Sequence, residues 1–214
     1  MMMIKRWIYY LVGLNLIAAA VVLNIRFDLG VAAFSSVMYV IAELYDISMG
    51  TASILCYLIF VVLQCVLLRR ATMNVLLEIP LSFAFGILID VYDVVIPELA
   101  LGLVMKFVCF ALTLFVTALG VFLCVKTDLV LTPIEGIVKT ISDVFHLRFS
   151  LVKNSFDLSM VVVSALLCVL NQAPFYGIGI GTVLSAIFVG RIIKIYESHV
   201  FTHTDFRHPQ DAVV

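Results

Sequence analysis

Charged side chains are scarce in this sequence, and their scarcity excludes a water-soluble fold. Asp, Glu, Lys and Arg make up 13% of the 214 residues, whereas 64% belong to the hydrophobic set. Soluble globular proteins carry roughly 25% charged residues. A chain of this length encloses too small a core to bury so much apolar surface. The excess must face the hydrocarbon of a membrane, so the lipid bilayer is the first partner that the sequence predicts.

Motifs of common enzyme and metal chemistry are also missing. The sequence contains no HExxH, GxSxG or GxxxxGK[ST] motif, and none of its five cysteines belongs to a CxxC pair. His199 and His203 are four residues apart, a spacing that can bind metal on a helix, but a polar tail is the commoner setting for such residues. We expect no enzyme activity, no metal, no cofactor and no nucleic-acid partner.

The first apolar run is too long for a secretory signal peptide. A positive flank precedes it, as in a signal peptide, but the run continues from Trp7 to Ile25. The apolar region of a signal peptide is about 7 to 15 residues long. We therefore expect a retained first span.

The chain contains an internal repeat. Shifted by 100 positions, residues 26–29 (Arg-Phe-Asp-Leu) fall on residues 126–129 (Lys-Thr-Asp-Leu), each set after a long apolar run. Beyond residue 70 the shift grows to 104, where residues 86–93 match residues 190–197, which indicates a four-residue insertion in the second copy. The predicted division of this all-α chain is a first helical repeat unit at residues 1–98, a second at residues 99–198 and a polar tail at residues 199–214.

Each unit contains four apolar segments, of which the second is short. The segments are residues 7–26, 31–45, 50–68 and 74–96, and residues 103–126, 131–146, 151–170 and 177–197. Segments 31–45 and 131–146 fall below the roughly 20 residues that a helix needs to cross a bilayer. If they are re-entrant or interfacial helices, the protein has six spans and inverted repeats. If they cross, it has eight spans and parallel repeats.

The distribution of Lys and Arg favours six spans, with both termini cytoplasmic. In that arrangement most cations lie on one side, and only Arg26 and Lys106 fall on the other. The cytoplasmic cations would be Lys5, Arg6, Arg69, Arg70, Lys126, Arg148, Lys153, Arg191, Lys194 and Arg207. The eight-span alternative violates the positive-inside bias more often.

Short motifs at equivalent places in the two units resemble the bacterial YczE/YitT family of uncharacterised membrane proteins. The motifs are residues 28–31 (Asp-Leu-Gly-Val), 48–51 (Ser-Met-Gly-Thr), 128–135 (Asp-Leu-Val-Leu-Thr-Pro-Ile-Glu) and 179–182 (Gly-Ile-Gly-Thr). Ala33, Phe34, Ser35 and Val130 depart from the family's D-L-G-[VA]-[SA]-P-[WF]-[DE] pattern. The resemblance covers almost the whole chain and implies a multi-pass protein of the bacterial inner membrane, without an established reaction.

Residues 132–135 (Thr-Pro-Ile-Glu) predict a helix start at a break in the chain. The Thr132 hydroxyl and the Glu135 carboxylate can form a capping box, with Pro133 at the first helical position. Because the break follows Asp128, the positive end of a helix dipole would lie in or near the membrane. Broken helices at equivalent points of inverted units hold substrates or ions in many secondary transporters. The competing interpretation is that Asp28 and Asp128 only end their spans at the interface.

Asp157 is the polar residue within a span that most suggests a function. It lies three residues after Asn154, hence on the same helical face, and should face protein or a water cavity rather than lipid. A carboxylate paired with Lys153 near the end of the span is an equally good interpretation.

Two further features have structural explanations. Glu78 begins an apolar segment, where we expect it beside Arg69 or Arg70. The glycines of residues 177–181 (Gly-Ile-Gly-Ile-Gly) follow no strand, so they favour close helix packing or local unwinding over nucleotide binding.

The leading hypothesis is a small inverted-repeat transporter or permease for an unknown small solute or ion. Its candidate pathway residues are Asp28, Asp128, Thr132, Glu135 and Asp157. The alternative is a non-transporting membrane component that binds a protein partner or lipid. A homodimer fits either hypothesis.

Overall fold

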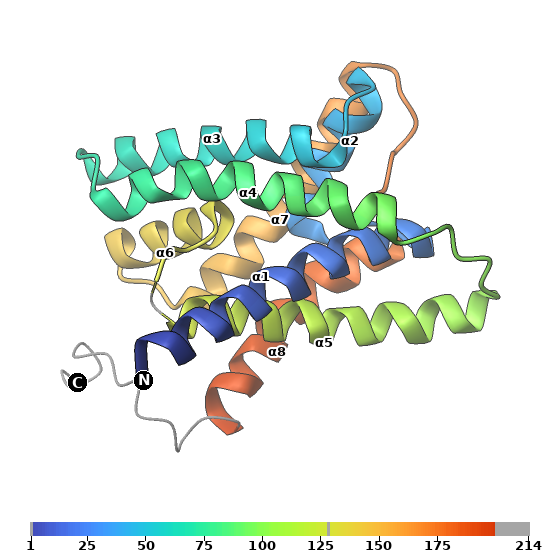
Figure 1. Ribbon diagram of the computed structural model, residues 1–214. Coiled ribbons are helices and arrows are strands. Elements are labelled where there is room, and N and C mark those ends of the chain that lie inside the picture. Colours follow the sequence, from blue (N-terminus) through green and yellow to red (C-terminus); the bar gives the residue numbers. More distant parts are fainter. Residues whose placement is uncertain (1, 128, 200–214) are drawn as a thin grey trace.

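The computed structural model describes residues 2–127 and 129–199, with the side chains of residue 2 and residues 197–199 left out. Within these residues the chain forms eight α-helices and one 3₁₀ turn, and no strand (Figure 1). The long helices are α1 (Met2–Phe27), α3 (Met49–Leu68), α4 (Met73–Val95), α5 (Leu103–Thr127), α7 (Phe149–Leu170) and α8 (Ile180–His199). The short elements are η1 (Ala33–Ser35), α2 (Ser36–Tyr45) and α6 (Pro133–Phe145). The predicted segments correspond to these elements, and most of the predicted tail lies outside the described residues.

The short helices α2 and α6 do not reach across a bilayer. They contain 10 and 13 residues. At about 1.5 Å of rise per residue, their lengths fall well short of the roughly 30 Å of hydrocarbon in a membrane. Both begin among buried residues and end at left-handed residues, Asp46 (φ 51°) and His146 (φ 55°). The prediction that these two segments are unusually short is confirmed.

The chain enters and leaves α2 at the same end of the bundle, which we call the α2 end. Arg26, in the last turn of α1, pairs with Asp93 in the last turn of α4, with 2.9 Å between Nη2 and Oδ1. At the start of α3, the Gly50 N–H donates to Asp90 Oδ1 (2.8 Å), and the Ser48 hydroxyl donates to Oδ2 (2.9 Å). The end of α4 therefore contacts both the end of α1 and the start of α3.

The connection through α6 returns to the opposite end, which we call the α6 end. Arg6, near the start of α1, donates from Nη2 to the carbonyl of Thr127, the last residue of α5 (2.6 Å). The start of α7 lies against Gly190 of α8, whose neighbours are Asn154 and Ser150. The second half of α8 also contacts α5, where the rings of Phe122 and Tyr196 are 6.1 Å apart.

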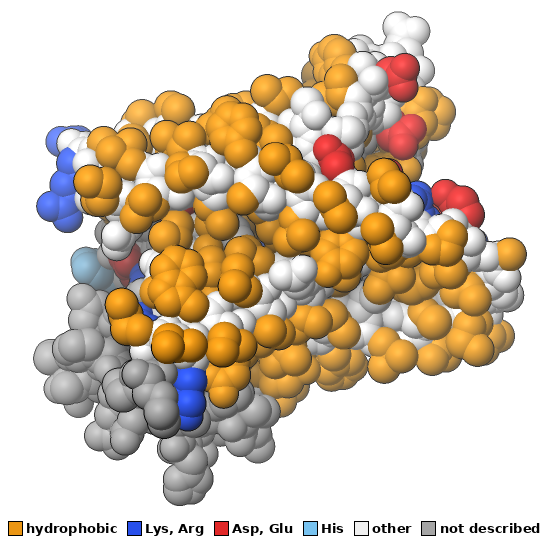
Figure 2. Space-filling view, viewed as in Figure 1, with side chains coloured by type: hydrophobic (Ala, Val, Ile, Leu, Met, Phe, Trp, Pro, Cys, Tyr) orange, Lys and Arg blue, Asp and Glu red, His pale blue; other side chains and the backbone are white. Residues whose placement is uncertain are grey.

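Apolar side chains cover the sides of the bundle, while charged side chains gather near its ends (Figure 2). Five helices, α1, α3, α4, α5 and α7, are long and apolar enough to cross a membrane. α8 has 20 residues but carries Arg191 and Lys194 in its second half. Large apolar side chains are exposed along the five apolar helices, for example Leu112, Val66 and Ile87. So many exposed apolar side chains require an apolar solvent, which is the hydrocarbon of a lipid bilayer. The protein is therefore a helical membrane protein.

The centre of the bundle is the antiparallel pair α1 and α5, which lie side by side in Figure 1. Gly13 and Gly120 face each other where the two helices cross. A Cβ at either position would overlap the carbonyl oxygen of the other glycine, at a distance of 2.9 Å. Farther along, the Thr113 hydroxyl donates to Asn24 Oδ1 (2.6 Å). Small residues let the backbones approach, and the buried hydrogen bond fixes the register.

The glycines of residues 177–181 bring two non-helical segments together before α8. The Val31 N–H donates to the Gly177 carbonyl, and the Gly181 N–H donates to the Leu29 carbonyl, both at 2.8 Å. A Cβ at Gly179 would overlap the Leu29 carbonyl. Of the two alternatives predicted for these glycines, close helix packing or local unwinding, residues 177–179 fit the second, because α8 begins at Ile180, three residues later than the apolar run suggested.

Substituting Gly50→Ala should destabilise the contact between α3 and α4. A Cβ at this position would overlap the Gly86 carbonyl and come within 2.5 Å of the Asp90 carboxylate. We expect a loss of about 1–3 kcal/mol, the usual cost of overpacking, measured as a lower thermal midpoint in detergent. Gly102→Ala is the matched control, because a Cβ there meets nothing within 4 Å. Equal midpoints for the two variants would contradict this packing.

Candidate functional site

Three charged side chains form a buried group, which we call the charge cluster: Glu135, Lys153 and Asp157. Lys153 Nζ lies 3.0 Å from Asp157 Oδ1 and 4.0 Å from Glu135 Oε1. The three residues are 3% exposed or less. Lys153 and Asp157 are one turn apart on α7, whereas Glu135 comes from the first turn of α6. The cluster therefore ties the start of a short helix to a long one.

The charge cluster lies where the two halves of the chain meet. Lys153 Nζ is 4.9 Å from the centre of the Phe34 ring, which belongs to η1, just before α2. Phe156, beside the cluster on α7, packs edge-on against Phe60 of α3 at 5.5 Å. The cation is therefore held by two carboxylates and an aromatic face, the groups that stabilise an ammonium ion out of water.

The cluster holds two carboxyl groups and one ammonium group. Glu135 and Asp157 together can carry two negative charges, while Lys153 carries one positive charge. An unbalanced charge among buried residues is costly in a low-dielectric surrounding. When both carboxyl groups are ionised, a proton, a cation or the cationic part of a solute would balance the extra negative charge.

A second buried polar group lies beside the cluster, around Glu78 of α4. Gln64 Nε2 of α3 donates to Glu78 Oε2 (2.5 Å), and the Thr140 hydroxyl of α6 donates to Gln64 Oε1 (3.3 Å). A cavity of about 250 Å³, which we call the α6-side cavity, reaches these residues. Lys139 and Asp143 of α6 also line it. The cavity is polar and lies at the α6 end of the bundle.

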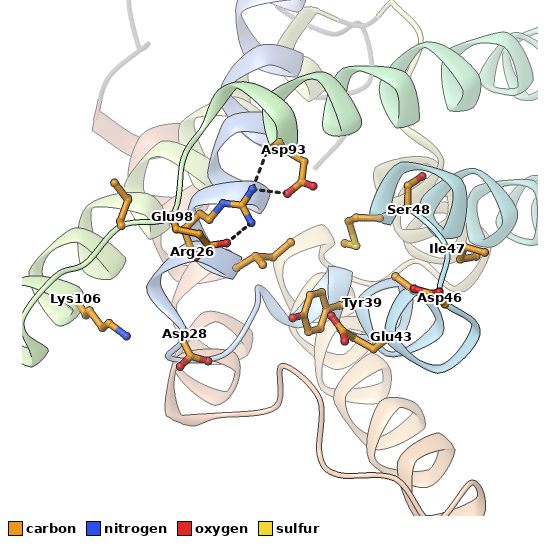
Figure 3. Close-up of a pocket in the computed structure, with 14 residues that line it drawn as sticks. Arg26, Asp28, Tyr39, Glu43, Asp46, Ile47, Ser48, Asp93, Glu98 and Lys106 are labelled. Carbon is orange, nitrogen blue, oxygen red and sulfur yellow. Dashed lines mark hydrogen bonds and ion pairs between the residues drawn. The ribbon is translucent and has the colours of Figure 1, made fainter.

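A larger and strongly acidic pocket, which we call the α2-side pocket, lies at the other end. Its volume is about 580 Å³. Its acidic lining residues are Asp28, Glu43, Asp46, Asp93 and Glu98. Figure 3 shows them on three sides of the pocket, with Arg26 pairing with Asp93 and with Glu98, whose Oε1 is 3.1 Å from Arg26 Nη1.

Arg26 and Lys106 both line this α2-side pocket. They are the two cations that the six-span arrangement places on the side opposite to all the others. Their place beside a surplus of carboxylates gives a local electrostatic reason for this departure from the positive-inside bias.

The structure brings two of the predicted pathway residues together and separates the others. Glu135 and Asp157 meet at Lys153. Asp28 lines the α2-side pocket, and Asp128 lies outside the described residues. Thr132 is 2% exposed, and its hydroxyl has no hydrogen-bond partner among the described residues.

Two local predictions are wrong. α6 begins at Pro133 as expected, but Thr132 makes no side-chain capping bond, and the Glu135 carboxylate lies 4.0 Å from the Lys153 ammonium. Glu78 does not neighbour Arg69 or Arg70. It is buried and bonded to Gln64, which lies one turn before the end of the adjacent helix.

Sequence reasoning offered the Lys153–Asp157 pair as one of two interpretations, but it missed Lys153 as the centre of the site and missed the pairing of Glu78 with Gln64. The spacing of Lys153 and Asp157, four residues apart on a helix, was a usable signal for a pair. Glu78 stands in an apolar helix, where a carboxylate by default marks a functional position. Within the described residues, no group of three or more His, Cys, Asp or Glu side chains could hold a metal ion.

Comparison with known proteins places this arrangement in a family. The model of DUF6198, a family of unknown function, matches residues 4–198. The chain belongs to the DUF6198 family. This DUF6198 protein is also 26% identical over 200 residues to the uncharacterised protein YyaS of Bacillus subtilis (strain 168), covering 92% of this chain and 95% of that one. No solved structure matches the chain. Neither family match names YczE/YitT, so that narrower relation stays a prediction.

Removing the ammonium from the charge cluster should destabilise this DUF6198 protein strongly. Lys153→Met leaves two buried carboxylates without a cation, which typically costs about 3–5 kcal/mol. Thermal unfolding in detergent measures the loss. Lys194→Met, an exposed position on α8, is the control. A triple variant that also carries Glu135→Gln and Asp157→Asn should recover much of the stability, and a single variant as stable as the parent would contradict the pairing.

Proposed function

We propose that the protein is a small inverted-repeat transporter or permease for a small solute or ion, with six spans and two re-entrant helices. The observation that carries the proposal is the buried charge cluster at the start of α6, between a cavity at one end of the bundle and a pocket at the other. A buried, unbalanced charge cluster is costly in a membrane protein and marks a substrate or ion pathway.

Equivalent contacts in the two halves support the inverted repeat. α3 packs against α6, and α7 packs against α2 and η1, which is the same relation after a shift of 100 residues. The Ser164 hydroxyl donates to Ser36 Oγ (2.8 Å), and residues one hundred positions away, Gln64 and Gly136, are also in close approach. Both contacts lie between the first turn of a short helix and the second half of a long one.

The helix ends repeat in the same way. After α2, the Ile47 N–H donates to the Ala42 carbonyl (3.1 Å), and after α6 the Leu147 N–H donates to the Ser142 carbonyl (3.0 Å). The left-handed residues Asp46 and His146 lie between these partners, again one hundred positions apart. Matching caps on helices that emerge at opposite ends are what an inverted duplication produces.

The transport pathway would run from the α2-side pocket through the charge cluster to the α6-side cavity. In this pathway Asp28 attracts a cationic or protonated species at the pocket, and Glu135 and Asp157 receive it at the centre. Lys153 keeps the empty site electrically tolerable, because its ammonium can pair with either carboxylate. Thr132 offers a hydroxyl with no other partner among the described residues.

The proposed orientation puts the α6 end at the cytoplasmic side of a bacterial inner membrane. Arg69 and Arg70 in the turn before α4, and Arg148 before α7, support it by the positive-inside bias. The N-terminus of α1 would then be cytoplasmic, as would the end of α8. Homodimerisation and the relation to the YczE/YitT family remain predictions.

Transport is tested by flux into proteoliposomes across a panel of small cations, amines, amino acids and organic acids. At least one solute should enter faster than into empty liposomes, and Asp157→Asn should abolish that flux because the charge cluster changes. Ser159→Ala, exposed on the same helix, should leave it unchanged. Background flux for every solute with folded protein would refute transport and favour a membrane component that binds a protein partner or lipid.

The inverted arrangement is tested by cysteine accessibility at Tyr45 and Phe145, the exposed last residues of α2 and α6. In a chain whose native cysteines are replaced, Tyr45→Cys should react with an impermeant maleimide added outside intact cells. Phe145→Cys should react only in inverted vesicles. Labelling of both positions from the same side would contradict the six-span arrangement.

A further inference from the structure

Glu78 is a buried carboxyl group whose hydrogen-bond partner is an amide. It is 3% exposed and lies in the second turn of α4. Among the described residues, no ammonium or guanidinium group lies within 4.0 Å of it, in contrast to Glu135 and Asp157. A carboxylate in this position is costly when ionised, since neither water nor a counter-ion solvates it fully.

The partner of Glu78 is held in one orientation. The Thr140 hydroxyl donates to Gln64 Oε1, which leaves Gln64 Nε2 to donate to Glu78 Oε2. One carboxyl oxygen is therefore occupied by an amide donor in either protonation state. The other oxygen, Oε1, is left for a proton, and the protonated group remains hydrogen-bonded.

Gly136 makes room for the carboxyl group. A Cβ at this position would overlap Glu78 Oε1, lie 2.8 Å from Oε2 and lie 2.9 Å from Gln64 Oε1. The carboxyl group thus contacts the bare backbone of α6, two turns from the surface end of that helix. Gln64, Glu78 and Gly136 all line the α6-side cavity, so the carboxyl group has an aqueous route to one end of the bundle.

Ionisable groups surround Glu78 on each helix packed against α4. On α1, the Tyr10 hydroxyl is buried, has no hydrogen-bond partner among the described residues and is within electrostatic range of Glu78. On α6, Glu135 is within electrostatic range, while Lys139 and Asp143 line the cavity. On α3, in contrast to α1 and α6, the group that contacts Glu78 is the neutral amide of Gln64. The groups named around Glu78 are therefore a phenol, a neutral amide, two further carboxyl groups and the ammonium group of Lys139.

We propose that Glu78 is a proton-binding site that exchanges with the aqueous phase at the α6 end of the bundle. The exchange breaks the O–H bond of the carboxylic acid, and the proton passes to water in the α6-side cavity, leaving a carboxylate bonded to Gln64. The role of Glu78 as the coupling-ion site of a transporter rests on the proposed function. Its exchange of a proton with the cavity is inferred from the geometry alone.

The test is labelling with N,N′-dicyclohexylcarbodiimide, which modifies protonated carboxyl groups in apolar surroundings, followed by peptide mass spectrometry. In inverted membrane vesicles the Glu78 peptide should carry the adduct, and its yield should fall as the bath pH rises. In intact cells held at constant internal pH, the yield should not follow the external pH. Glu78→Gln should remove the adduct, whereas Glu98→Gln, an exposed carboxylate at the other end, should not.

Three outcomes would overturn the proposal. They are a Glu78 peptide that is never modified, a yield that is independent of pH on the α6 side, and a yield that falls with added Na⁺ at constant pH. The last outcome would assign a metal cation in place of the proton. Labelling requires no transported solute, so a failed flux assay with pH-dependent labelling refutes transport alone, and the converse refutes only the proton site.

Discussion

The interior of this protein depends on stabilising one buried ammonium group, that of Lys153, away from water. Lys153 is fully buried, and a lone charge there would destabilise the helices around it by several kcal/mol. Asp157 on its own helix and Glu135 on α6 compensate that charge. Because Glu135 sits in the first turn of α6, the same interaction fixes how deeply this short helix enters the bundle.

The depth of the short helices in turn arranges the openings at the two ends. α2 and α6 each leave part of the bundle unfilled, and polar hollows occur beside both: the α2-side pocket and the α6-side cavity. Their linings differ in charge. Five carboxylates line the first, whereas Glu78 and Asp143 share the second with Lys139. The two ends of the bundle therefore offer polar surroundings of different charge.

Much of the fold could be predicted from the lengths of apolar runs, since the bilayer sets a minimum for a crossing helix. The shortness of α2 and α6, and the start of α6 at Pro133, came from that rule and from helix-start residues. The site was only partly predictable. Gln64 and Glu78 lie on different helices, and their pairing depends on a tertiary contact with Gly136 that no local pattern encodes. The local pattern that suggested a capping box likewise does not encode the approach of Glu135 to Lys153 on another helix.

The charge cluster is confined to one half of the sequence. One hundred positions before Glu135, Lys153 and Asp157 stand Ser35, Ser53 and Tyr57, which are buried but uncharged. The hydroxyl of Ser35 donates a hydrogen bond to the Ala32 carbonyl, and the hydroxyl of Ser53 donates one to the Met49 carbonyl. A chain assembled from two copies of the amino-terminal half would thus keep the arrangement of helices but would lack all three charged side chains of the cluster.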